Sequence, residues 1–406
     1  MPTRLAPTSV RVLTAALAFG VVVALPQIAS AQADPTAQAA AQIVPAAPGP
    51  AAPVAQAETA VRSPQQFAQQ FFATVRANFA QWDLNHDGTL TREEIELVMQ
   101  NPRVVGDAAA ALAALKLGST KSNELANTRS FVAADIDAME RQVAAGQKLD
   151  PNFVLYFAAG LKKLAQQPRQ LFIEGIPRMT AIRQDFTSDC YFLSAAGAVA
   201  QANPQAIVRL IARNRDGSFT VSFPNQQPLR VPPPTDAEIA TYTISKDGIW
   251  LGVLQKAFAT IRIRMEPSQP ATRQPMDSVG FRTGSTRVME LLTGHPSRAI
   301  LLPTETHQAV DDRLIAQTRS ELTAAFRERR AVTASNTHHA YAVVAYDAEA
   351  DLVTVHNPYD RGGVETWLEG DKVQRTEEGF FMIPTARFVA SFSNVRFEVN
   401  NGRIGS

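Results

Sequence analysis

The period of the hydrophobic pattern changes at Pro168, and this change constrains the fold more than any other feature of the sequence. Ahead of Pro168, apolar residues recur at helical spacing, as Phe67, Phe71 and Val75 do. Behind it, short runs typical of β-strands appear between helical stretches, with the helices grouped early and the strands late. The sequence therefore predicts an all-α module followed by a domain of the α+β class.

The expected elements can be placed by residue number. Ser63 is the expected N-cap of the first helix, and Pro64 suits the first helical position. Further helices are expected at 108–117, 131–145, 190–202, 250–263 and 311–330. Strands are expected at 219–223, 340–346, 352–356, 380–383 and 395–399.

The first 31 residues have the pattern of an export signal. Arg4 and Arg11 supply positive charge, residues 12–25 are apolar, and Ala29-Ser30-Ala31 fits a cleavage site. An uncleaved anchor is the alternative, but the apolar run is shorter than the ~20 residues that span a bilayer. No later segment is long and apolar enough to be a transmembrane helix. We expect a signal peptide over residues 1–31 and a periplasmic or secreted mature protein without an integral membrane domain.

Three further regions follow the expected signal peptide. Residues 32–62 are rich in Ala, Pro and Gln, which predicts a disordered or semi-extended linker. Residues 63–167 form the expected helical module, and residues 168–400 form the expected α+β domain. The 406 residues carry 39 basic and 38 acidic side chains, for a net charge of +1. This balance argues against nucleic acid as a partner and against electrostatic attachment to a membrane.

A twelve-residue segment of the helical module has the pattern of an EF-hand calcium loop. Gly88 stands where this loop needs a sharp turn with positive φ, and Leu90 is the usual apolar anchor. No second good loop is found, and a polar surface turn that matches by chance is the alternative. We expect Ca²⁺ to bind with a dissociation constant of about 10⁻⁴–10⁻³ M, as in extracellular modules. The expected ligands are Asp83, Asn85, Asp87, the Thr89 carbonyl, Thr91 through a water, and bidentate Glu94.

Cys190 is the single cysteine of the chain, so it cannot form an internal disulfide. A buried cysteine acting as a small hydrophobe is one interpretation. However, a polar turn leads directly into an apolar helix at Cys190, and a helix N-terminus lowers the pKa of a thiol. Gln184 lies six residues upstream and can donate its amide to an oxyanion. This pattern predicts a nucleophilic cysteine.

Most of the six histidines do not qualify as the base for such a thiol. His86 lies inside the calcium loop, and His295 and His307 lie in polar loops with no obvious partner. If residues 340–356 form a hairpin centred on Ala348, His339 lies opposite Asn357 on one face. In that register the other face carries His338 opposite Pro358 and His356 opposite Ala340. The register therefore selects a Cys–His–Asn set made of Cys190, His339 and Asn357.

These segments resemble the calpain-type cysteine proteases, which are a papain-like group. In that family the nucleophile lies in Gln-Gly-x-x-Gly-Asp-Cys-Trp-Phe-Leu, the base in His-Ala-Tyr, and its orienting amide in Asn-Pro-Trp-Gly. The matching residues are Gln184, Asp189, Cys190, Phe192, Leu193, His339-Ala340-Tyr341 and Asn357-Pro358, with further likeness at 250–259 and 379–392. The resemblance covers about residues 170 to 400. It implies a papain-like fold, with a helical part and an antiparallel β part, and thiol endopeptidase activity on polypeptides.

The chain departs from the family pattern at several positions. Asp185 and Ser188 replace the two glycines of the nucleophile motif, which affects how closely a substrate backbone can approach. Tyr191 and Tyr359 replace tryptophans, Asp360 replaces the last glycine, and the calcium sites of the calpain core do not map onto this sequence. Two alternatives to a protease remain open here. One is an inactive calcium-dependent binding protein on a protease scaffold, and the other is a transglutaminase-like acyl transferase, which usually orients its histidine with aspartate.

Overall fold

The computed structural model describes residues 62–119, 130–243, 245–265, 274–280, 285–306, 310–337, 339–359, 374–375 and 379–399. The chain divides into two units, Met1–Ala60 and Val61–Ser406, and all described residues belong to the second. The expected signal peptide, nearly all of the expected linker, His307 and His338 lie outside the described residues. Among the helices that are described, none combines the length and the hydrophobicity needed to cross a membrane.

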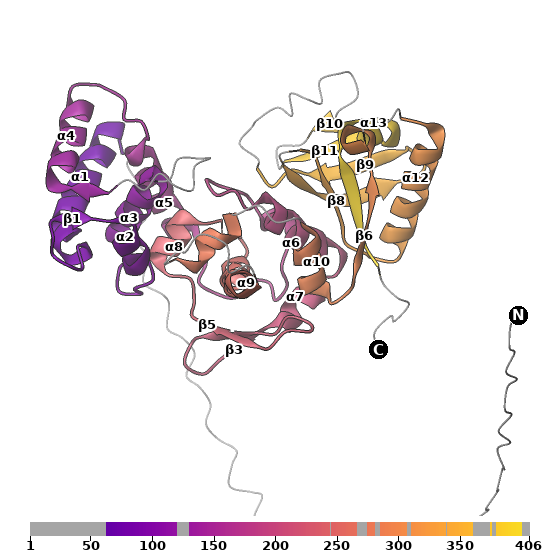
Figure 1. The fold of residues 1–406 in the computed structure, drawn as a ribbon, viewed down its shortest axis with the longest axis horizontal. Helices are drawn as coiled ribbons and strands as arrows, with labels where there is room; N and C mark the ends of the chain where they lie inside the picture. Colours follow the sequence, from indigo (N-terminus) through magenta and orange to yellow (C-terminus); the bar gives the residue numbers. More distant parts are fainter. Residues whose placement is uncertain are drawn as a thin grey trace, which may run out of the picture. The chain divides into compact units, whose positions relative to one another are not determined.

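The second unit begins with a helical region (Figure 1). Its elements are α1 (Pro64–Trp82), β1 (Thr89–Leu90), α2 (Arg92–Met99), α3 (Gly106–Ser119), β2 (Phe131–Val132), α4 (Ala133–Ala144) and α5 (Phe153–Gln166). The predicted start of α1 is confirmed: Ser63 is the N-cap, and its hydroxyl accepts the Gln66 N–H. Phe71 and Val75 of the predicted apolar face are fully buried in the core of this region.

Strands β1 and β2 pair antiparallel, although the sequence predicts no second loop as a partner for the candidate EF-hand loop. Leu90 lies opposite Phe131, and both side chains are fully buried. The expected helix at 131–145 therefore begins at Ala133, because residues 131–132 are used for this pairing. As a result the helix–strand–helix unit of α1, β1 and α2 lies beside a second unit that includes α3, β2 and α4.

A mixed helical region and a small sheet follow. The elements are η1 (Met179–Ala181), α6 (Cys190–Ala202), α7 (Pro204–Leu210), β3 (Ile211–Arg213), β4 (Phe219–Val221), β5 (Leu229–Val231), α8 (Asp236–Thr241), α9 (Trp250–Met265), η2 (Pro275–Gly280) and α10 (Ser285–Thr293). Strands β3, β4 and β5 form an antiparallel sheet in that order. Helices α6 and α9 are the two largest contributors to the core that this sheet shares, with Phe192 and Trp250 fully buried.

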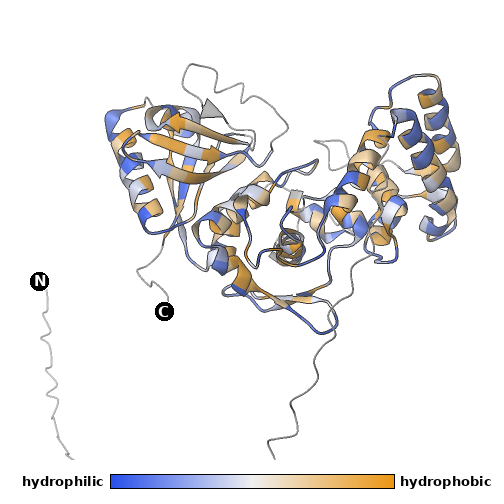
Figure 2. Cartoon of the chain, turned by 180° about the vertical axis from the view of Figure 1, so that it is seen from behind, coloured by the Kyte–Doolittle hydropathy of each residue, from blue (hydrophilic) through white to orange (hydrophobic). Residues whose placement is uncertain are grey.

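The last region is an antiparallel sheet in the order β10-β11-β9-β8-β7-β12-β6. Its elements are β6 (Ser297–Leu301), α11 (Pro303–Thr306), α12 (Asp312–Arg327), β7 (Val332–Ser335), β8 (Ala340–Asp347), β9 (Leu352–His356), β10 (Gln374–Arg375), β11 (Phe380–Pro384), α13 (Thr385–Ser391) and β12 (Asn394–Glu398). Figure 2 shows its central strands as mostly hydrophobic, whereas helices of the chain alternate between hydrophilic and hydrophobic sides. This mixture of helices and antiparallel strands agrees with the predicted α+β class.

Strand β8 is shared by two cores because its side chains alternate between the faces of the sheet. Ala342 and Val344 belong to the core that contains α6. Tyr341 and Val343 belong to a second core, which α12 and α13 complete. The two faces of one strand therefore link the helical part of the domain to its β part.

The hairpin register predicted from the sequence is wrong by two residues. The structure pairs Ala342 with His356 and Asp347 with Leu352, whereas the prediction placed His356 opposite Ala340. The turn spans 348–351, with Asp351 at a φ of 55°, and it shifts the pairing beside it by three residues; a bulge between Val343 and Ala345 reduces the shift to two at the end that carries His356. A shift of two residues leaves every side chain on its own face, so the prediction that His339 and Asn357 share a face is unaffected.

Candidate active site

Cys190 is the first residue of α6, and Asp189 occupies the N-cap position. The following Phe192 and Leu193 are buried in the core and hold the helix in place. The Cys190 side chain itself is only partly buried. The backbone N–H groups in the first turn of a helix have no partner within the helix, and they direct positive potential toward the thiol. The predicted placement of Cys190 in a first helical turn is confirmed.

His339 and Asn357 are joined by a hydrogen bond, with 2.7 Å between His339 Nε2 and Asn357 Oδ1. Asn357 Oδ1 also accepts the backbone N–H of Tyr359 at 2.9 Å, which identifies this atom as the oxygen of the amide. Nε2 of His339 must therefore carry a hydrogen, because an amide oxygen can only accept. The other ring nitrogen, Nδ1, is the one that remains for proton transfer.

Further contacts fix the position of His339, and sequence reasoning missed them. The side chain of Asn336 accepts the His339 N–H at 2.8 Å, and the Asn336 N–H donates to the His339 carbonyl at 3.0 Å. The rings of Tyr341 and Tyr359 meet the imidazole edge-to-face, with centroid distances of 4.8 and 6.5 Å. The contact with Tyr341 could have been predicted only from the alternation of side chains along the strand, because residues two positions apart lie on the same face.

Gln184 is nearly buried, and two hydrogen bonds hold it. Its backbone N–H donates to the Pro358 carbonyl at 2.6 Å, and its side-chain Nε2 donates to the Thr187 carbonyl at 2.5 Å. The first bond ties residues 184–189, which we call the nucleophile loop, to the residue that follows Asn357. The loop before Cys190 and the strand end that carries Asn357 are therefore brought together.

Helix α5 of the helical region also contacts the nucleophile loop. Lys163 Nζ lies 3.0 Å from a carboxylate oxygen of Asp185, and it donates to the Tyr242 carbonyl at 2.6 Å. The ring of Tyr156 meets the ring of Phe186 edge-to-face at 4.9 Å. Asp185, which replaces a glycine of the family motif, therefore has a structural role. Nothing in the local sequence signals these contacts.

A buried polar pair lies beneath the nucleophile loop. Asp189 and Gln255 of α9 are both almost fully buried, and Gln255 Nε2 donates to Asp189 Oδ2 at 3.0 Å. Burial raises the pKa of Asp189 to about 7, while the hydroxyls of Thr187 and Thr243 act in the opposite direction. A carboxyl group next to the cysteine is thus held in surroundings that disfavour its charge.

Outside the candidate calcium loop, which contains His86, two further described histidines are engaged elsewhere. His356 is buried, and its ring packs against that of Phe380 at 4.8 Å. His295, for which the sequence suggests no partner, pairs with Glu398, with 2.5 Å between His295 Nδ1 and Glu398 Oε1. Neither histidine shares the contacts that hold His339.

The candidate calcium loop lies between α1 and α2. Asp83 accepts the N–H groups of Asp87 and Gly88, and Gly88 has the expected positive φ, 83°. Glu94 turns back to the start of the loop, where its Oε1 accepts the Leu84 N–H at 2.9 Å. Within the described ranges, no group of three or more His, Cys, Asp or Glu side chains is gathered as a metal site.

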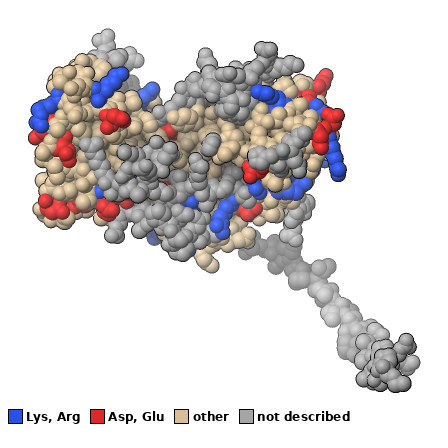
Figure 3. Space-filling view, turned by 45° about the horizontal axis from the view of Figure 1, so that its top comes forward, with Lys and Arg blue, Asp and Glu red and all other residues tan. Residues whose placement is uncertain are grey.

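The surface charge agrees with the near-neutral composition. On the face drawn in Figure 3, acidic and basic side chains are interspersed among the residues shown in colour.

The parts of a cysteine-protease site are a cysteine at the start of a buried helix and a histidine that is hydrogen-bonded to an asparagine. Here the histidine and asparagine lie at strand ends of an antiparallel sheet. The family model for calpain family cysteine proteases matches residues 161–396, and the chain belongs to this family. A comparison with curated proteins found no match. The matched range spans the nucleophile loop and the sheet, and it begins within α5.

Proposed function

We propose that this protein is a cysteine endopeptidase that hydrolyses peptide bonds in polypeptides, with Cys190 as nucleophile and His339 as base. Asn357 orients the imidazole, and Gln184 stabilises the oxyanion. The observation that carries the proposal is the 2.7 Å hydrogen bond between His339 and Asn357, which leaves Nδ1 of the imidazole for the thiol proton.

The packing of α6 on β8 supports the role of Cys190. A Cβ built on Gly197 would lie 3.9 Å from Cβ of Ala342, and Gln201 Nε2 donates to the Val344 carbonyl at 3.5 Å. Helix and strand therefore advance in the same direction. A helix rises about 1.5 Å per residue and a strand about 3.3 Å. Cys190 thus lies about 10 Å before Gly197, which corresponds to about three strand residues before Ala342, at the level of His339.

The chemistry follows from these positions. Transfer of the Cys190 proton to His339 Nδ1 gives a thiolate and an imidazolium, which the Asn357 oxygen stabilises. The thiolate attacks the substrate carbonyl carbon, and the oxyanion accepts N–H groups from the Cys190 backbone and the Gln184 side chain. The imidazolium then returns the proton to the leaving amine, and water hydrolyses the acyl-enzyme to release the acid and restore the thiol.

Two features decide against the alternatives. All the chemical groups of the mechanism are retained, which argues against an inactive scaffold. The partner of His339 is an amide rather than the aspartate that transglutaminases usually use. Hydrolysis by a thiol protease remains the simplest function for this set of residues.

The first prediction concerns the nucleophile and its base. Cys190→Ala and His339→Ala should each lower the rate of cleavage of an unfolded polypeptide by several orders of magnitude, because the triad acts as a unit. His295→Ala, which removes a histidine paired with Glu398, is the matched control and should cleave at nearly the wild-type rate. Cleavage is measured with purified, folded proteins. A Cys190→Ala variant that cleaves at the wild-type rate would exclude the mechanism.

We also propose that the loop from Asp83 to Glu94 binds Ca²⁺. The donor set suits the ion, because Ca²⁺ prefers six to eight oxygen ligands and the loop offers carboxylates at its first, fifth and twelfth positions. Asp83, Asn85, Asp87, the Thr89 carbonyl, Thr91 through a water, and Glu94 would hold it. The carboxylate of Glu94 already lies against the start of the loop, so a rotation of this side chain would bring its oxygens to the ion.

The second prediction is that Ca²⁺ raises the temperature of thermal unfolding. Binding to the native state alone stabilises it by mass action, and three carboxylates repel one another without a cation. The Asp83→Ala/Glu94→Ala protein should lose this response. Calcium titrations monitored by unfolding and by calorimetry provide the measurement. An equal response in both proteins would remove the loop as the site.

A further inference from the structure

Asp189 and Gln255 each contain a buried oxygen that the structure leaves without a hydrogen bond. Gln255 Nε2 donates to Asp189 Oδ2 at 3.0 Å, but Asp189 Oδ1 and Gln255 Oε1 accept no hydrogen bond in the described part of the chain. The hydroxyls of Thr187 and Thr243 lie close enough to lower the pKa of Asp189, but neither bonds to Oδ1 with hydrogen-bond geometry. Both residues are at most 2% exposed, so bulk water does not reach these oxygens. An unsatisfied buried acceptor is costly, and two that belong to one bonded pair require an explanation.

One proton satisfies both oxygens. An ionised carboxylate and an amide oxygen are both acceptors, so they cannot bond to each other. A protonated carboxyl group donates one hydrogen bond and accepts another, which matches the donor and acceptor of a side-chain amide. The two groups can then form a closed pair of hydrogen bonds, one in each direction.

We propose that Asp189 is held as a neutral carboxylic acid whose Oδ1–H is donated to Gln255 Oε1, and that this pairing keeps a negative charge away from the sulfur of Cys190. Asp189 is thereby a positioning residue for the thiolate. This inference rests on the proposed role of Cys190 as nucleophile.

The surrounding charges support a neutral Asp189. None of the ion pairs formed among the described residues includes it. The titratable and charged groups on the elements around it have other partners. These pairs are Asp185 with Lys163, Lys256 with Glu238, Arg262 with the Tyr191 hydroxyl, and Tyr242 with Asp277. Cys190 and His339 form the proposed catalytic pair. The charge of Asp185 on the same loop further disfavours ionisation. Burial raises the pKa of Asp189 to about 7 despite the opposing effect of the Thr187 and Thr243 hydroxyls, in agreement with the geometry.

The consequence for catalysis is electrostatic. Cys190 follows Asp189 directly in the sequence, so an ionised Asp189 would place a negative charge beside the thiolate. Like charges disfavour each other, and the pKa of the thiol would rise. Ionisation of Asp189 as the pH rises above about 7 should therefore lower the population of the reactive thiolate–imidazolium pair.

The test uses the full chain and separates the state of Asp189 from the reactivity of Cys190. Infrared difference spectra between about pH 5 and pH 9 should show a protonated carboxyl band in the wild type that is lost near pH 7 and is missing from Asp189→Asn. Asparagine preserves both hydrogen bonds and cannot ionise. Alkylation of Cys190 by iodoacetamide should be similar in both proteins at pH 6. At pH 8 it should be about tenfold faster in the variant, because only about a tenth of Asp189 would remain neutral.

Two outcomes overturn the proposal. One is a wild type without this carboxyl band at pH 5, which would mean that Asp189 is ionised and that a buried water satisfies the two oxygens. The other is an alkylation profile that is the same in wild type and Asp189→Asn from pH 6 to pH 9. The infrared measurement needs no catalysis, so a carboxyl band in a protein without peptidase activity would support the neutral acid while rejecting the protease.

Discussion

At the scale of single residues, the proposed mechanism depends on the charge states of the groups near the Cys190 sulfur. Asn357 supports a charged His339, because its oxygen accepts the Nε2–H at 2.7 Å. Asp189 lies one residue before Cys190 and is almost fully buried against Gln255, and burial disfavours its negative charge. The two side chains therefore have different electrostatic roles: Asn357 stabilises the positive charge of His339, whereas Asp189 avoids a negative charge near the Cys190 sulfur.

The third prediction concerns the effect of pH on stability. The pKa of Asp189 is about 7 in the native state and about 3.9 in an unfolded chain. Between these values the native protein retains a proton that the unfolded chain releases, so this group lowers the free energy of unfolding as pH rises from about 4 to about 7. Asp189→Asn removes that loss. It should be more stable than wild type at pH 8, by up to about 4 kcal/mol, and not at pH 4. Urea unfolding at the two pH values measures this, and an equal effect at both would contradict it.

At the scale of elements, the short pairing of β1 with β2 organises the helical region. Phe131 is fully buried opposite Leu90, and its ring meets that of Phe153 from α5 at 5.8 Å. The same contact therefore links the half that contains α1, β1 and α2, the half that contains β2 and α4, and helix α5, which reaches the nucleophile loop. A pairing of only two residues on each strand contributes little by itself, so the buried side chains of Leu90 and Phe131 are what make this element important.

The fourth prediction tests that role. Phe131→Ala should lower the free energy of unfolding by about 3–5 kcal/mol, because it leaves a cavity in a closed core. Val132→Ala is the matched control on the same strand, since Val132 is exposed, and its effect should stay within about 0.5 kcal/mol. Both are measured by chemical denaturation. Comparable losses in the two variants would mean that the strand, and not the buried ring, carries the stability.

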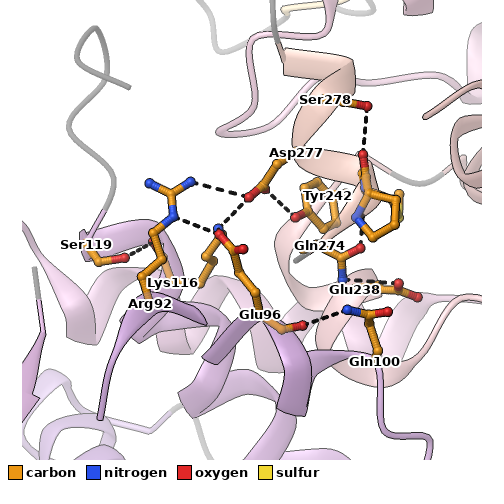
Figure 4. Close-up of polar contacts among 12 residues, drawn as sticks. Arg92, Glu96, Gln100, Lys116, Ser119, Glu238, Tyr242, Gln274, Asp277 and Ser278 are labelled. Atoms are coloured by element: carbon orange, nitrogen blue, oxygen red, sulfur yellow. Dashed lines mark hydrogen bonds and ion pairs between the residues drawn. The ribbon is translucent and has the colours of Figure 1, made fainter. Parts of the chain in front are cut away.

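At the scale of the whole second unit, the helical region and the protease domain share buried groups. The core of the helical region includes Ala237, Tyr242 and Met276, which come from beyond α6 in the sequence. Lys116 of α3 bonds to Glu96 of α2 and, at 2.5 Å, to Asp277 of η2, as Figure 4 shows.

Figure 4 also shows that Asp277 accepts the Tyr242 hydroxyl and that Arg92 completes the group. Burial alone would raise the pKa of Glu96, but Lys116 and Arg92 together lower it to about 2. The network is therefore charged and satisfied, and each member depends on the others.

The fifth prediction is that Lys116→Met destabilises the protein by about 3–5 kcal/mol, because Glu96 and Asp277 would lose their shared buried ammonium and keep Arg92 as their one cation in the network. Arg230→Ala, which breaks an exposed ion pair with Asp216, is the control and should cause no measurable change. Chemical denaturation followed by fluorescence provides the free energies. A single transition is also expected, since the shared core couples the two regions. Two separate transitions in the wild type would contradict that coupling.

Much of the local structure follows from the sequence alone. Helix α6 spans Cys190–Ala202 and strand β9 spans Leu352–His356, as predicted. The cap at Ser63 and the turn at Gly88 are also predicted correctly. Each of these features is decided by residues a few positions apart, through hydrophobic period, capping groups and the backbone freedom of glycine. The order of the cysteine, histidine and asparagine segments likewise sufficed to indicate the class of site.

Only the tertiary structure decided how distant segments meet. The pairing of Leu90 with Phe131, the contact of Lys163 with Asp185 and the burial of Asp189 against Gln255 join residues that no local pattern relates. The hairpin register was missed because a bulge and a longer turn shift the pairing without altering which face a residue occupies. The sequence could therefore determine which residues have the right chemistry, because chemistry and local backbone preference belong to each residue and its neighbours. Burial, register and charge environment depend on the packing of the whole unit, and these set the state of the groups around Cys190.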